Sequence, residues 1–92
     1  MDLKEQLARL DVLRNDRSTW AHNTLRDTYT ATLEDVRITV TDNGEEVTWQ
    51  LVENNELQWK GLSATLKQAM SDACDFTRAY LQSRVNTTHL VN

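Results

Sequence analysis

The feature that most constrains this chain is the segment Asp42-Asn43-Gly44-Glu45, which lies between two runs of alternating apolar and polar residues. Asn-Gly readily adopts the two positive φ values of a type I′ turn, so the segment predicts a β-hairpin. Counting outward from the turn, the predicted pairs are Val40 with Val47, Ile38 with Trp49, and Val36 with Leu51. These six apolar side chains would share one face of the sheet. The other face would carry Arg37, Thr39, Thr41, Glu46, Thr48 and Gln50.

A third strand is predicted at 57–60, after a polar turn at 53–56. If the loop spans 52–56, Leu57 lies opposite Leu51 and Trp59 lies opposite Trp49, which extends the apolar face. A four-residue loop would instead place Trp59 beside Gln50 on the polar face. The first register is favoured, and whether Trp59 packs in the core or anchors a partner stays open.

The segment before the hairpin also alternates, with Tyr29, Ala31 and Leu33 set between threonines. The odd-numbered phase of these residues conflicts with the even-numbered phase of Val36. A bulge or bend at Glu34-Asp35 would reconcile the two phases.

Two helices are predicted outside the strands. The first spans about 3–14, with Asp2 as N-cap, Glu5 three positions later, and a stripe formed by Leu3, Leu7, Leu10 and Leu13. The last spans about 63–85, where its stripe comprises Leu62, Leu66, Ala69, Ala73, Phe76 and Tyr80, widened by Met70, Leu81 and Val85. Ser18 or Thr19 could cap an extra short helix near 18–28, or one long kinked helix could cover the whole N-terminal part.

Together these elements predict an α+β fold of chain order α-β-β-β-α. It is a three-stranded antiparallel meander with the N- and C-terminal helices packed on one face. At 92 residues, the chain has room for a single domain. We expect residues 1–85 to form that globular domain and residues 86–92 to be a flexible C-terminal tail.

Composition indicates the compartment and the class of partner. A single cysteine excludes an intramolecular disulfide, and no apolar run approaches the roughly 18 residues that a membrane span needs. The first residues lack the pattern of a signal peptide. We therefore expect a cytoplasmic protein that binds no membrane. The net charge of −4 has the wrong sign for a general phosphate-binding surface.

Catalytic and metal-binding patterns are sparse. Cys74 and His22 could in principle form a nucleophile and its base, but Cys74 falls on the packed stripe of the last helix, so an inert buried cysteine is favoured. The carboxylates fall in turns and on helix faces without the spacing of a metal motif. We therefore predict no catalytic residues, no metal and no cofactor, and expect that the protein is not an enzyme.

By elimination, the sequence predicts a non-enzymatic protein-binding module. It would be a small accessory or inhibitory protein, of the kind that phages and mobile elements encode, docking on a larger complex through an acidic surface. A complex that binds nucleic acid is one candidate for this partner. In a meander the two acidic turns lie at opposite ends of the middle strand. The predicted partner-binding residues are Asp42, Glu45, Glu46, Glu53, Glu56 and Trp59.

Other readings stay open. A nucleic-acid-binding regulator would use a basic stripe of Arg14, Arg17, Arg26 and Arg37, and clustering of these side chains on one face would favour it. A small enzyme subunit is the third reading. The Leu3–Leu13 helix either covers the sheet or pairs with its own copy in a homodimer.

Overall fold

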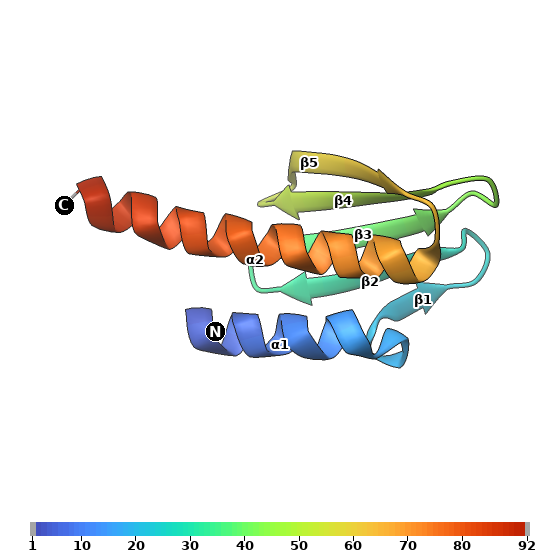
Figure 1. The fold of residues 1–92 in the computed structure, drawn as a ribbon, viewed down its shortest axis with the longest axis horizontal. Coiled ribbons are helices and arrows are strands. Elements are labelled where there is room, and N and C mark those ends of the chain that lie inside the picture. The colour runs from blue at the N-terminus through green and yellow to red at the C-terminus, as the bar shows by residue number, and fades with distance from the viewer. Residues whose placement is uncertain (1, 92) are drawn as a thin grey trace.

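The computed structural model describes the backbone of residues 2–91 and the side chains of residues 2–84. Its elements are α1 (Leu3–Asn15), the 3₁₀ helix η1 (Arg17–Thr19), β1 (Ala21–Asn23), β2 (Thr28–Leu33), β3 (Val36–Asp42), β4 (Val47–Glu53), β5 (Glu56–Ser63) and α2 (Leu66–Val91). The strands form one antiparallel sheet in chain order, β1-β2-β3-β4-β5. Figure 1 shows α2 lying along the sheet beside α1.

The α+β class is confirmed, but the sheet has five strands instead of the predicted three. The two additional strands are β1 and β2. The prediction of a helix near 18–28 is wrong, because only η1 is helical there and β1 follows at once. Trp20 explains the change of direction: its buried ring donates from Nε1 to the carbonyl oxygen of Leu13 at 2.8 Å, which holds η1 against the end of α1.

The phase conflict before β3 is resolved by a complete hairpin. Leu33 pairs with Val36, so Glu34 and Asp35 form a two-residue turn, and Glu34 has a φ of 57°. Residues on both sides of this turn therefore point their apolar side chains to the same face.

The predicted register of β3 and β4 is wrong by two residues. Val40 pairs with Trp49, Ile38 pairs with Leu51, and four residues from Asn43 to Glu46 form the loop. Only Gly44 has a positive φ in this loop, at 91°, so the turn is not type I′. Because side chains alternate with a period of two, a shift of two residues leaves the buried face unchanged.

The type I′ turn lies instead between β4 and β5, at Asn54 and Asn55. These residues have φ values of 52° and 68°, and Glu53 pairs with Glu56 across them. A register shift between Leu51 and Val52 then places Trp59 opposite Leu51 instead of Trp49. The predicted partner of Trp59 is wrong, but its predicted face is right.

The core lies between the sheet and the two helices. The apolar face of β2, β3 and β4 is buried against Leu10 and Leu13 of α1 and against Ala69, Ala73 and Leu81 of α2. The large buried side chains of the sheet are Tyr29, Leu33, Val36, Ile38, Val40, Val47, Trp49 and Leu51. The predicted leucine stripe of α1 thus packs within the domain, since Leu3 and Leu7 also contact this core.

Both helix starts depend on side-chain caps. The Asp2 carboxylate accepts from the amide of Glu5 at 2.8 Å, which confirms the predicted cap of α1. α2 begins at Leu66, later than predicted, because residues up to Ser63 belong to β5. The Thr65 hydroxyl accepts from the amide of Gln68 at 3.1 Å.

The C-terminal part of α2 is longer than the sequence predicted, since the helix extends to Val91. The predicted tail at 86–92 overlaps this end, and its side chains lie outside the described residues, so its flexibility stays a prediction. Neither helix in the described part of the chain is both long and apolar enough to cross a bilayer.

Candidate protein-binding surface

The β3–β4 loop carries three of the predicted partner-binding carboxylates, and they have different roles. Asp42 accepts from the amide of Gly44 at 2.9 Å, while the amide of Asn43 donates to the Glu46 carbonyl at 3.0 Å. Asp42 therefore shapes the loop. Glu45 and Glu46 are exposed and give this end of the sheet its negative charge.

The β4–β5 turn carries the other two predicted partner-binding carboxylates, Glu53 and Glu56. Glu53 forms an ion pair with Arg84 of α2 and accepts from the Tyr80 hydroxyl at 2.5 Å, so this carboxylate fastens α2 to the sheet. Burial and the hydrogen bond to Glu53 raise the pKa of Tyr80 to about 12. Glu56 is exposed at this end of β5 and adds a negative charge there.

Trp59 lies on β5, which is an edge strand of the sheet. One face of its ring stacks on Phe76 of α2, with centroids 5.2 Å apart and an interplanar angle of 17°. The side chain is nevertheless 52% exposed. Trp59 is therefore anchored on one side and accessible on the other, in contrast to Trp20 and Trp49, which are buried.

Two leucines on the same strand were placed wrongly by the prediction, which set Leu57 opposite Leu51 on the apolar face and Leu62 on the helical stripe. Leu57 is paired with Val52 and Leu62 with Thr48, so both point away from the helices. They are 54% and 65% exposed. Leu62, which the sequence placed on the helical stripe, instead borders a hollow of about 500 Å³ with Glu46, Thr48 and Lys60.

The exposed groups on β5 and at its two ends are here called the β5 edge surface, which consists of Glu45, Glu46, Glu56, Leu57, Trp59 and Leu62. Leu57 and Leu62 lie on the face of the sheet away from the helices, and Trp59 lies on the helix side. β5 runs from the β4–β5 turn to Ser63, which pairs with Val47 beside the β3–β4 loop. Its eight residues span roughly 26 Å. The strand therefore joins the two acidic ends that the sequence placed apart, and large apolar side chains lie between them.

The candidate nucleophile and base have other environments. Cys74 is 1% exposed, and burial raises the pKa of its thiol to about 12, so it is a neutral thiol near pH 7. His22 stacks on Tyr29 at 4.0 Å and contacts Asp27 at 3.1 Å. In the described part of the chain, no three His, Cys, Asp or Glu side chains are grouped to hold a metal ion.

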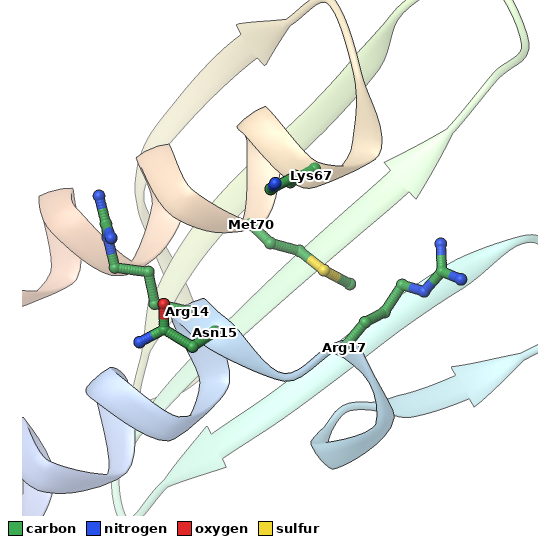
Figure 2. A pocket seen from close by; sticks show the side chains of 5 residues that line it. All are labelled: Arg14, Asn15, Arg17, Lys67 and Met70. Carbon is green, nitrogen blue, oxygen red and sulfur yellow. The ribbon is translucent and has the colours of Figure 1, made fainter.

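The four arginines of the predicted basic stripe are divided. Arg37 points away from the helices on β3, and Arg26 lies in the β1–β2 loop. Arg14 and Arg17 line a cavity of about 370 Å³ between the end of α1 and the start of α2, together with Asn15, Lys67 and Met70 (Figure 2). Lys67 was not part of the predicted stripe, because only the fold brings the first turn of α2 beside α1.

Comparisons with models of known protein families, with curated proteins and with solved structures gave no match to this chain.

Proposed function

We propose that this protein is a non-enzymatic protein-binding module whose binding site is the β5 edge surface. The observation that carries the proposal is an edge strand with three half-exposed large apolar side chains between two acidic ends. Its role would be that of a small accessory or inhibitory protein, of the kind that phages and mobile elements encode, docking on a larger complex.

The backbone of β5 supports strand addition as the binding mode. A strand at the edge of a sheet has a row of backbone N–H and C=O groups without sheet partners, and an extended segment of another protein can pair with them. Leu57 and Leu62 on one side of the strand, and Trp59 on the other, would supply the side-chain contacts. Tryptophan is among the residues that most often dominate interface energies.

Charge defines the partner's chemistry. Glu45 and Glu46 lie near one end of β5 and Glu56 at the other, in a chain of net charge −4. The complementary segment is apolar in its middle and basic at both ends. A basic surface that normally binds nucleic acid is one source of such a segment, because carboxylates can occupy sites that phosphates otherwise fill.

The alternative functions receive less support from the arrangement. A nucleic-acid-binding regulator would need the basic residues on one face, and Arg26 and Arg37 lie away from Arg14 and Arg17. An enzyme subunit would need an activated nucleophile, and the Cys74 thiol is buried and has a raised pKa.

The test is site-specific photo-crosslinking in extracts of the source organism. A photoreactive residue replaces Gln58 on β5, and the matched control replaces His22 on β1, the opposite edge of the same sheet. We expect a protein adduct from position 58 that is absent at position 22. Equal adducts from both edges would contradict the proposal.

The captured partner is then purified, and its affinity is measured for three variants. Leu62→Glu should weaken binding at least tenfold, because it replaces an apolar contact with a charge. Leu25→Glu is the control, since Leu25 is 97% exposed in the β1–β2 loop, and it should bind like the parent chain. Glu45→Lys with Glu46→Lys should slow association and reduce its salt dependence.

The variants also separate acidic from apolar recognition. If the charge reversals leave affinity and salt dependence intact while Trp59→Ala and Leu62→Glu abolish binding without unfolding the domain, the acidic ends do not contribute. If only the reversals weaken binding, the strand-addition mode is wrong.

A further inference from the structure

The cavity between α1 and α2 is a second candidate binding site, and it shares no residue with the β5 edge surface. Its wall consists of Arg14, Asn15, Arg17, Lys67 and Met70. Three of these five side chains are cationic and none is acidic. Figure 2 shows the Met70 thioether between Lys67 and Arg17, whereas the guanidinium groups of Arg14 and Arg17 extend away from one another.

The positive charge at this site is only partly neutralised. Arg14 is bound to Asp75 of α2, with Nε 2.9 Å from Oδ1. In the described part of the chain, Arg17 and Lys67 have no carboxylate within ion-pair distance. The nearest acid in sequence, Asp16, is occupied by the amide and hydroxyl of Ser18 at 3.0 and 2.6 Å.

The backbone that carries these cations is held in place. Two ion pairs, Arg14–Asp75 and Arg78–Asp11, join α1 to α2. Trp20 fixes η1, from which Arg17 projects, to the end of α1. Met70 is almost fully buried and belongs to the core. The cavity is therefore formed by anchored elements, and only the ends of Arg17 and Lys67 have freedom to adjust to a ligand.

We propose that this cavity binds the phosphate group of a small phosphorylated molecule. Arginine and lysine together are the side chains that recognise a multiply charged oxyanion. The volume of about 370 Å³ lies within the range of small-molecule sites, about 300–1,000 Å³, and exceeds what a bare phosphate ion fills. The Met70 side chain offers an apolar contact for the organic part of the ligand.

A compact ligand is favoured over a nucleic-acid strand. A strand needs a series of cations along its backbone, whereas Arg26 and Arg37 lie outside this cavity and the chain as a whole is acidic. A single concave site with three cations fits one phosphate group better than a repeating row of them.

The experiment is a titration of the ¹⁵N-labelled full chain followed by NMR. The ligands are inorganic phosphate, adenosine monophosphate and, as the phosphate-free control, adenosine. We expect saturable amide shifts confined to residues 14–17 and 65–70, with a dissociation constant for adenosine monophosphate below roughly 1 mM. Phosphate should bind at the same residues more weakly, and adenosine should not bind.

Matched variants decide whether the cavity is responsible. Arg17→Gln and Lys67→Gln should each weaken adenosine monophosphate binding about fivefold or more, because each removes a charged donor. Arg37→Gln removes the same charge from an exposed site on the other face of the sheet and should change the affinity less than about twofold. Thermal unfolding of each variant checks that the fold is intact.

Three results would overturn the proposal: no saturable shift up to roughly 10 mM phosphate or nucleotide, equal binding of adenosine, or equal effects of Arg37→Gln and Arg17→Gln. A single-stranded oligonucleotide is titrated in parallel. If it binds more tightly than the mononucleotide and its binding depends on Arg26 and Arg37, the site is part of a nucleic-acid surface and the small-molecule assignment is wrong.

Discussion

Trp49 packs directly against the backbone of β5 at Gly61, its partner in the sheet register. A Cβ atom added at Gly61 would lie 2.2 Å from Cε2 of the Trp49 ring, which is far inside van der Waals contact. The ring is buried between the sheet and Phe76, with ring centroids 5.6 Å apart. Glycine is therefore required here for space, whereas Gly44 is favoured by its backbone conformation.

The substitution Gly61→Ala should lower the free energy of unfolding by about 2–3 kcal/mol, because the Trp49 ring or the β5 backbone must move. Gly44→Ala is the control: nothing lies within 4 Å of its added Cβ, and its φ of 91° predicts a cost nearer about 1 kcal/mol. Urea denaturation measures both. A smaller loss at Gly61 than at Gly44 would contradict this view of the contact.

The buried Cys74 thiol and the partly buried Tyr80 hydroxyl predict a loss of stability in alkali. Burial raises the pKa of Cys74 from 9.0 to about 12, and burial with the Glu53 hydrogen bond raises that of Tyr80 from 10.0 to about 12. The folded state thus favours the neutral forms. The stabilisation is complete below the unfolded pKa values and is lost as pH rises from about 9 to 12.

We therefore expect the unfolding midpoint to fall across this pH range. Cys74→Ala should reduce the decrease of the midpoint that begins near pH 9. Tyr80→Phe should reduce the further decrease that begins near pH 10. Thermal unfolding followed by circular dichroism at a series of pH values measures the curves. Curves of both variants that run parallel to that of the parent chain would show that other groups cause the alkaline loss.

At the scale of elements, the two loops that flank β4 differ in backbone conformation. The β4–β5 turn has two asparagines with positive φ, whereas Asn43 in the β3–β4 loop has no positive φ. Asparagine tolerates the left-handed region better than most residues, and glycine tolerates it best. The same substitution should therefore have opposite effects in the two loops.

Asn55→Gly should keep or raise the stability by up to about 0.5 kcal/mol, because the φ of 68° suits glycine. Asn43→Gly should lower it by about 0.5–1 kcal/mol, because it adds freedom to the unfolded chain without relieving strain. Chemical denaturation of both variants is the measurement. If Asn43→Gly is the stabilising change, the type I′ turn lies where the sequence first placed it.

The alternating pattern predicted which face of the strands is buried, and the structure confirms that face for Val36, Ile38, Val40, Trp49 and Leu51. It did not predict the register. Alternation has a period of two, so a shift of two residues leaves every apolar side chain on the same face. The register therefore depended on which residues form the tight turn. Asn43-Gly44 is the stronger signal for a type I′ turn, but Asn54-Asn55 forms it.

β2 showed the alternation of a strand, but the turn after it and the strand before it had weak signals. The turn between β2 and β3 consists of Glu34 and Asp35, which contain no glycine, asparagine or proline, and β1 has only three residues. The prediction of the candidate binding surfaces from the sequence was also incomplete. The sequence showed which turns carry charge. It did not show that Arg84 forms an ion pair with Glu53 or that Lys67 lies beside α1, because both depend on contacts between distant parts of the chain.

At the scale of the whole molecule, the two edges of the sheet are protected unequally. β1 is short, whereas β5 has eight residues and carries Lys60 near its middle. A lysine on an edge strand discourages pairing between copies of a chain. The same edge that we propose for partner binding is thus protected against self-association by Lys60.

Lys60→Val should therefore increase self-association at roughly 100 µM protein, even though the loss of a positive charge makes the chain more acidic and opposes association. Lys4→Val, on the exposed side of α1, removes the same charge and should leave the oligomeric state unchanged. Sedimentation velocity over a range of concentrations measures this. Identical behaviour of the two variants would mean that β5 is not open to pairing.

The contact between α1 and α2 also has a consequence for synthesis on the ribosome. Each strand pairs with its neighbour in the chain, so the hairpins can form as they emerge, but Arg14 and Asp75 are 61 residues apart. At a synthesis rate of roughly 5–20 residues per second, α1 is completed about 3–12 s before the part of α2 that packs against it. During that interval the core lacks the side chains that α2 contributes, so we expect the nascent domain to stay incompletely packed until α2 is complete.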